Sequence, residues 1–150
     1  IDIRSGRRED IEQIAEFQIR MALETEGMHL DRETVNCGVS AVFDDPSRGE
    51  YWVAESESGP VGVLLTVPEW SDWRNGTVLW IHSLYVLPEW RGKGVFRALY
   101  DQLRNKVLAS NSLKGLRLYV DRRNGHAQAV YGQLGMTAEH YQLFEWMKDA

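Results

Sequence analysis

The sequence predicts an α/β fold in which a mixed central sheet of six to seven strands is flanked by about four helices. Two patterns indicate this: apolar residues alternate with polar ones in some segments and recur at helical spacing in others. The third observation is the order of the segments: strand, two helices, three strands, helix, strand, helix, and one or two final strands. The strand–helix–strand succession from about 77 to 120 implies a parallel crossover within a mixed sheet.

The first half of the chain provides one strand, two helices and a hairpin. The predicted elements are a strand at 1–4, helices at 8–22 and 31–46, and strands at 51–56 and 61–70. Asp31 is a suitable N-cap for the second helix, and Pro46 ends it. The two later strands flank a glycine-proline turn, which is typical of a hairpin.

The second half alternates strands and helices. The predicted elements are strands at 77–87, 116–120 and 141–147, and helices at 94–110 and 124–135. The run at 77–87 is almost continuously apolar, as in a strand buried on both faces. The apolar side of the helix at 94–110 is predicted to consist of Phe96, Leu99, Tyr100, Leu103 and Val107. For the helix at 124–135 it consists of Ala127, Val130, Tyr131 and Leu134, with Gly135 as the stop.

Length and composition indicate one domain over residues 1–150. The chain is 43% hydrophobic and 26% charged, and it has no evident repeat or linker. A net charge of −5 argues against nucleic-acid binding. Cys37 is the only cysteine, which excludes a disulfide within the chain and favours a cytoplasmic location. We expect no metal site and no membrane span, because ligand spacing and long apolar runs are both missing from the sequence.

The turn between the strand at 77–87 and the following helix is the most informative stretch. Gly92 and Gly94 let the backbone approach a bulky anion closely. The first N–H groups of the helix lack internal partners, and Arg91, Lys93 and Arg97 add positive charge. The turn therefore favours a phosphate or diphosphate ligand. An ordinary glycine turn with solvated cations is the alternative.

Two common phosphate motifs do not fit this turn. The dinucleotide pattern requires a third glycine where Arg97 stands. The P-loop pattern requires Gly-Lys-Ser/Thr, whereas the sequence has Gly94, Val95 and Phe96.

The stretch "LYVLPEWRGKGVF" instead resembles the acyl-CoA motif of the GNAT family of N-acetyltransferases. The matching residues are Leu84, Val86, Pro88, Arg91 and Gly94. A second segment, "NGHAQAVYGQLGM", resembles another motif of the family. It matches at Asn124, Ala127, Tyr131, Leu134, Gly135 and Met136. The order of elements also resembles the GNAT fold, so the resemblance covers essentially the whole chain.

The resemblance implies transfer of an acetyl group from acetyl-CoA to a primary amine by direct attack in a ternary complex. Acetyl-CoA is then the acyl-donor substrate, and a small-molecule amine is the expected acceptor. The implied CoA-binding residues are Leu84, Tyr85, Val86, Arg91, Gly92, Lys93, Gly94, Val95, Phe96, Arg97, Asn124 and Tyr131. Phe96 departs from the family pattern, which has a small residue there. We expect its ring to turn toward the core side of the helix.

The resemblance also implies catalytic roles. Tyr131 matches the tyrosine that protonates the departing thiolate; a core-filling role is the alternative. His82 is the candidate base, and strand alternation would place it on the side of Trp80 and Leu84. A histidine buried in the core is its alternative role. Glu69 is the rival base, and water is a third possibility.

The acceptor side is less specific. Tryptophans and carboxylates gather in the loops that border the acceptor pocket in GNAT proteins: Trp70, Trp73, Trp80, Trp90, Glu24, Glu26, Glu69 and Asp72. These residue types suit a cationic amine. The alternatives are a homodimer surface for the tryptophan-rich edge and ordinary solvation for the carboxylates. The other functions considered are a non-catalytic CoA-binding module for sensing or assembly, and a protein-lysine or N-terminal acetyltransferase.

Overall fold

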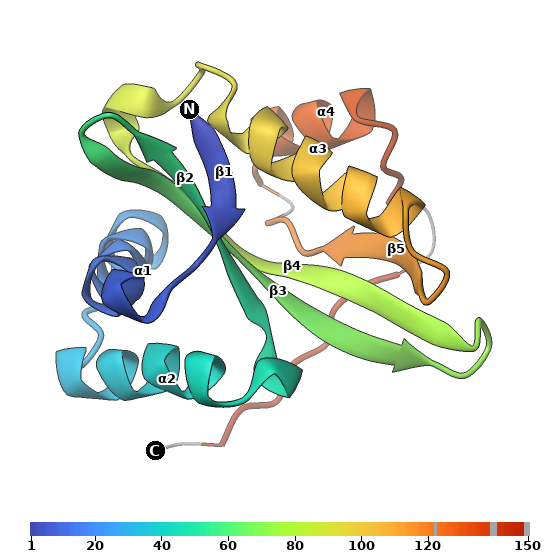
Figure 1. The fold of residues 1–150 in the computed structure, drawn as a ribbon, viewed down its shortest axis with the longest axis horizontal. Coiled ribbons are helices and arrows are strands. Elements are labelled where there is room, and N and C mark those ends of the chain that lie inside the picture. Colours follow the sequence, from blue (N-terminus) through green and yellow to red (C-terminus); the bar gives the residue numbers. More distant parts are fainter. Residues whose placement is uncertain (122, 139–140, 149–150) are drawn as a thin grey trace. The chain divides into compact units, whose positions relative to one another are not determined.

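A computed structural model describes residues 1–121, 123–138 and 141–148 of the chain. The chain divides into two compact units, Ile1–Leu118 and Tyr119–Ala150 (Figure 1). The first unit contains the sheet and three α-helices, and the second contains the last helix, α4.

The sheet of the first unit has five strands in sequence order. They are β1 (Asp2–Ser5), β2 (Glu50–Ser56), β3 (Gly59–Ser71), β4 (Gly76–Val86) and β5 (Leu113–Leu118). The first three pairings are antiparallel, and β4 pairs with β5 in parallel. The predicted hairpin, the parallel crossover and the mixed character of the sheet are therefore confirmed.

The prediction of six to seven strands is wrong for the residues that the structure describes. The predicted strand at 141–147 has no strand structure. Most of its side chains are aromatic or aliphatic, yet Tyr141, Phe144 and Trp146 are 80%, 89% and 86% exposed. Aromatic residues favour strands, but a strand also requires an edge with which to pair.

The described residues form four α-helices. They are α1 (Ile11–Glu26), α2 (Arg32–Asp44), α3 (Val95–Leu108) and α4 (Gly125–Gln133). The predicted cap of α2 is confirmed, because the Asp31 side chain accepts a hydrogen bond from the Thr34 N–H at 3.0 Å. Gly135 follows α4 with a φ of +88°, in the left-handed region that only glycine adopts easily. None of the helices among these residues is long and apolar enough to cross a membrane.

Helices cover both faces of the sheet (Figure 1). On one face, α1 and α2 pack on alternate strand residues, including Val53, Val63 and Tyr85. On the other face, α3 inserts Val95 against Gly62, where an added Cβ would lie 3.1 Å from the valine side chain. Val95 is 2% exposed, whereas Phe96 is only half-buried. Val95, and not the predicted Phe96, is therefore the residue that packs most deeply at the start of α3.

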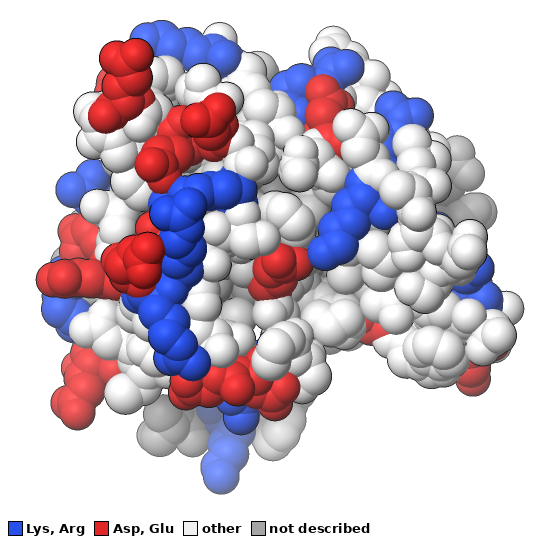
Figure 2. All heavy atoms as spheres, viewed as in Figure 1, with Lys and Arg blue, Asp and Glu red and all other residues white. Residues whose placement is uncertain are grey.

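Exposed charges of both signs lie interspersed over α1 and α2 on the face drawn in Figure 2. Several form ion pairs, such as Arg32 with Glu16 at 2.7 Å and Arg8 with Asp44 at 3.0 Å. Exposed pairs of this kind contribute little to stability.

A more buried ion pair fastens the N-terminal strand to the start of α1. The Asp10 side chain is 7% exposed and accepts from Arg4 Nη1 at 2.7 Å and Arg4 Nη2 at 2.9 Å. It also accepts from the Arg7 N–H at 2.7 Å. These bonds replace the water that the carboxylate loses on burial.

Asp10→Asn is therefore expected to lower the free energy of unfolding by about 3 kcal/mol. The hydrogen bond from Arg4 holds the pKa of Asp10 below its usual range. The stabilisation is thus fully present above about pH 4 and is lost as the pH falls through the lower folded-state pKa. Urea denaturation between pH 3 and 7 measures both effects. Glu12→Gln, on the exposed side of α1, is the control, and equal losses in the two variants would contradict this account.

Candidate active site

The glycine turn before α3 adopts the conformation that its sequence requires. Gly92 and Gly94 have φ values of +74° and +83°, and no atom lies within 4 Å of where a Cβ would be. Glycine is needed here because of the backbone angles, since the surrounding space is open. Gly94 is the N-cap of α3, and no side chain caps the helix.

The turn presents unpaired backbone donors. Within the described part of the chain, the N–H groups of Gly92, Lys93, Gly94 and Val95 have no hydrogen-bond acceptor. The first backbone bond at this end of α3 runs from the Ala98 N–H to the Gly94 carbonyl at 3.0 Å. The exposed cations Lys93 and Arg97 lie in the same segment as these donors and the positive end of the helix dipole. This arrangement suits an anion.

Arg91, at the start of the turn, is already engaged. Its Nη2 donates to Glu24 Oε2 at 2.8 Å, and its Nε donates to the Val86 carbonyl at 2.9 Å. The Tyr85 hydroxyl donates to the other Glu24 oxygen at 2.8 Å. Sequence reasoning assigned Arg91 to the CoA site and Glu24 to the acceptor border, and it missed their pairing. The two residues are 67 positions apart, so no local pattern indicates the contact.

Strand β4 extends beyond its pairing with β5 where it approaches the turn. Its pairing with β5 ends at Ile81 opposite Leu118, the last residue of the first unit. Leu84, Tyr85 and Val86 continue to pair with β3 on the other side. Within the first unit, their main-chain groups on the β5 side therefore face no strand. An extended ligand with amide groups can pair with such an edge as an added strand would.

His82 lies at a β-bulge. Leu65 is opposite Ser83 and Thr66 is opposite Ile81, so His82 is the extra residue on β4. The bulge interrupts the alternation that was expected to group His82 with Trp80 and Leu84. The His82 side chain is exposed, so the alternative of a buried core histidine is wrong. Bulges often re-aim a side chain beside an active site.

Glu69, the rival base, has both oxygens occupied. Arg117 Nη1 donates to Oε1 at 2.9 Å, and the Trp80 indole donates to Oε2 at 3.0 Å. The Arg117 guanidinium also lies 5.8 Å from the centre of the Trp80 ring. Both oxygens of the Glu69 carboxylate therefore already accept a hydrogen bond from within the chain.

Tyr131 and Asn124 belong to the second unit. Burial raises the pKa of the Tyr131 phenol, which keeps it protonated at neutral pH. The Asn124 side chain accepts from the Ala127 N–H at 3.0 Å and so serves as the N-cap of α4. The predicted apolar side of this helix is confirmed: Ala127, Val130, Tyr131 and Leu134 are partly buried, whereas their neighbours are exposed.

Comparison with known proteins identifies the family. The model of the acetyltransferase (GNAT) family matches residues 9–136, which is most of the chain. A crystal structure of a possible acetyltransferase from Clostridium difficile 630 is 38% identical. The match covers 99% of this chain and 98% of that chain, with a TM-score of 0.91. The chain belongs to the GNAT acetyltransferase family.

More distant GNAT-like structures share the fold alone. A ribosomal-protein-alanine N-acetyltransferase from Brucella melitensis biovar Abortus 2308 is 19% identical, with coverage of 98% and 100% and a TM-score of 0.79. An aminoglycoside N-acetyltransferase in complex with CoA is 14% identical, with coverage of 99% and 95% and a TM-score of 0.78. No curated protein matches the sequence.

The tryptophans expected at the GNAT acceptor site have different surroundings. Trp70 and Trp73 are 65% and 89% exposed, so they do not form the walls of a closed pocket. Trp80 packs with Glu69 and Arg117, and the Trp90 ring centre lies 5.6 Å from the Lys93 ammonium. Of these four tryptophans, only Trp80 and Trp90 therefore interact with a charged side chain that was predicted for the site, namely Glu69 and Lys93.

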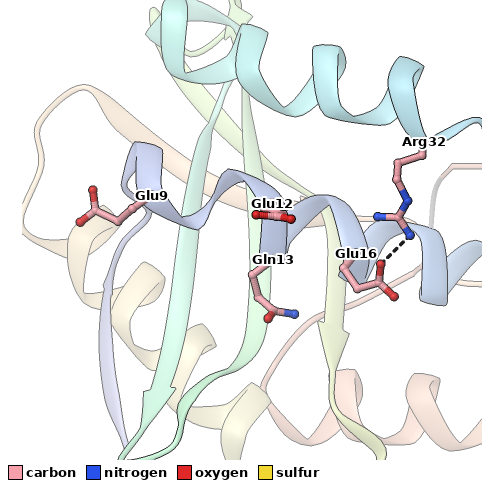
Figure 3. Close-up of a pocket in the computed structure, with 5 residues that line it drawn as sticks. All are labelled: Glu9, Glu12, Gln13, Glu16 and Arg32. Carbon is pink, nitrogen blue, oxygen red and sulfur yellow. Dashed lines mark hydrogen bonds and ion pairs between the residues drawn. The ribbon is translucent and has the colours of Figure 1, made fainter.

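A polar hollow of about 340 Å³ lies along the outer side of α1. Its lining, shown in Figure 3, consists of Glu9, Glu12, Gln13, Glu16 and Arg32. None of the residues predicted for the GNAT reaction is among them. Arg32 pairs with Glu16 across the rim, which leaves a mainly acidic surface. Across residues 1–121, 123–138 and 141–148, no group of three or more His, Cys, Asp or Glu side chains is placed to hold a metal ion.

Proposed function

We propose that this GNAT chain transfers an acetyl group from acetyl-CoA to a primary amine of a small molecule, by direct attack in a ternary complex. The observation that carries the proposal is the set of unpaired N–H groups at the glycine turn, beside the part of β4 that extends beyond its pairing with β5. The family match spans both units, which supports a single catalytic domain over residues 1–150.

The turn is the proposed diphosphate site. Backbone N–H groups from about 92 to 97 would bind the diphosphate oxygens, and Lys93 and Arg97 would neutralise their charge. The Phe96 ring packs at 6.1 Å from the Tyr100 ring of the same helix, which supports backbone binding despite the bulky residue. Main-chain groups of 84–86 would pair with the pantetheine amides, and Asn124 would contact CoA from the cap of α4.

The proposed reaction removes two protons from the ammonium form of the amine and adds one to the leaving thiolate. The amine must be neutral to attack, although alkylamines have a pKa near 10. His82 would accept the amine proton, since Glu69 is occupied by Arg117 and Trp80. The nitrogen would then attack the thioester carbonyl carbon while the Leu84 N–H holds the oxyanion. As the carbon–sulfur bond breaks, Tyr131 would give its proton to the thiolate, and the nitrogen would lose its second proton to solvent to leave the neutral amide. Solvent would return the proton from His82 to Tyr131.

A cationic small-molecule amine is the proposed acceptor class. The chain carries a net charge of −5, which favours a cationic over an anionic acceptor. A related fold occurs in an enzyme named as an aminoglycoside N-acetyltransferase, so the architecture is compatible with an acceptor of that kind.

A panel of amines tests the proposal. The protein is incubated with acetyl-CoA and polyamines, aminoglycosides, amino acids or amino-terminal peptides, and mass spectrometry identifies acetylated products. We expect acetylation of a small cationic amine with release of one CoA thiol per product. Acetylation confined to the peptides would contradict the acceptor class. CoA binding without acetylation of any amine would favour a non-catalytic CoA module.

His82→Gln is expected to lower kcat/KM for the amine about tenfold at pH 7, because glutamine accepts no proton. The loss should shrink near pH 9, where more of the amine is neutral in solution. Initial rates from pH 6 to 9 measure this difference. A loss that is the same at every pH would show that His82 does not act as the base.

A further inference from the structure

The start of the diphosphate turn is fixed by contacts that reach into the core. Arg91 is bound to the Val86 carbonyl through Nε and to Glu24 through Nη2. Its guanidinium carbon lies 5.5 Å from the centre of the Tyr85 ring. Its backbone N–H donates to the Pro88 carbonyl at 3.3 Å. Both the backbone and the side chain of Arg91 are therefore held directly before Gly92.

We propose that Glu24 is a positioning residue of the diphosphate turn, which acts by holding Arg91 so that the N–H groups of 92–95 converge on the ligand. This inference rests on the proposed function. It assigns Arg91 to the support of the turn, while Lys93 and Arg97 supply the charge that meets the diphosphate.

The carboxylate of Glu24 is itself anchored. Its Oε1 accepts from the Tyr85 hydroxyl at 2.8 Å, and Tyr85 is only 3% exposed. The Tyr85 ring lies 5.4 Å from the ring of Phe17, a residue of the core of the first unit. The bonds from Arg91 and Tyr85 lower the pKa of Glu24, so the carboxylate is charged at neutral pH. The chain of contacts thus runs from the core through Tyr85 and Glu24 to Arg91.

The geometry also argues against Arg91 as a direct diphosphate ligand. A guanidinium binds phosphate best through a pair of parallel N–H groups. Nη2 of Arg91 already donates to Glu24 and Nε to the Val86 carbonyl, so these two N–H groups are not available as a parallel pair for a phosphate. If the Arg91 side chain turned toward an anion, its bonds to Glu24 and Val86 would break. The residue directly before Gly92 would then no longer be held in place.

Positioning and simple electrostatics predict effects of opposite sign. Glu24 is a negative charge near a site for an anion, so its removal should tighten CoA binding if only charge matters. If Glu24 orders the turn, removal of its carboxylate should weaken CoA binding. Part of the binding free energy would then be spent on ordering the N–H groups of the turn.

The test is a calorimetric titration with CoA of the unaltered protein, Glu24→Gln and Glu26→Gln. Glu26 is an exposed carboxylate on the same helix, so its variant reports the effect of charge alone. We expect Glu24→Gln to weaken CoA about fivefold with unchanged stoichiometry, and Glu26→Gln to bind at least as tightly as the unaltered protein. Equal or tighter binding by Glu24→Gln would overturn the inference while leaving the proposed function in place.

Two further readouts separate positioning from a general loss of structure. In steady-state assays, Glu24→Gln should raise KM for acetyl-CoA and retain kcat at saturation. Arg91→Gln should weaken CoA binding, and adding Glu24→Gln to it should cause no further loss, since the two residues act as one unit. Additive losses would contradict the inference. Failure of the unaltered protein to bind CoA would overturn the proposed function together with the inference.

Discussion

Tyr131→Phe is expected to lower kcat about 100-fold while the affinity for CoA changes little. The variant removes the only proton that the side chain can give to the leaving thiolate. Burial raises the pKa of this phenol, so the proton is present throughout the neutral range. Stopped assays of thiol release give kcat, and calorimetry gives the CoA affinity of the same sample.

Tyr51→Phe is the matched control. Tyr51 is a buried tyrosine of β2 whose pKa burial raises to about 12, and it belongs to the core under α1 and α2. Loss of its hydroxyl should leave kcat unchanged. Equal kcat values for Tyr131→Phe and the unaltered protein would remove Tyr131 from the mechanism and return it to a packing role.

Gly94→Ala is expected to weaken CoA binding at least tenfold. Alanine at a φ of +83° costs about 1 kcal/mol relative to glycine, and relief of that strain requires the backbone to rotate. Such a rotation would reorient the N–H groups of Gly94 and Val95, which are proposed to bind the diphosphate. Calorimetric titration with CoA measures the loss of affinity.

Gly27→Ala is the control for the loss of stability that backbone strain causes anywhere in the chain. Gly27 ends α1 with φ and ψ of +65° and 21°, close to the +83° and 12° of Gly94, and both positions have open space around a Cβ. The two variants should lose similar stability in urea, but only Gly94→Ala should lose CoA affinity. Similar affinity losses in both would mean that general destabilisation explains the result.

The parts of the fold that local chemistry determines could be predicted from the sequence. The cap at Asp31 depends on a side chain that reaches a backbone N–H group three residues away. The glycine turn was also expected, although its glycines were assigned to close approach of an anion and are in fact required by their left-handed backbone angles. These local features, together with two motifs, were enough to indicate the GNAT family.

Features that depend on distant segments could not be predicted in this way. The bulge at His82 exists only in relation to the pairing of β4 with β3. The bond between Glu24 and Arg91 requires the end of α1 to reach a turn much later in the chain. The strand expected at 141–147 shows the same limitation, because strand-favouring residues do not supply a partner strand.

The central claim is that the N–H groups of the glycine turn hold the diphosphate of the acyl donor. The most direct test is a titration of ¹⁵N-labelled protein with CoA, followed by two-dimensional NMR of the backbone amides. The amide signals of Gly92, Lys93, Gly94 and Val95 are expected to shift downfield and to saturate together with the calorimetric binding curve. Saturable CoA binding that leaves these four signals in place would contradict it.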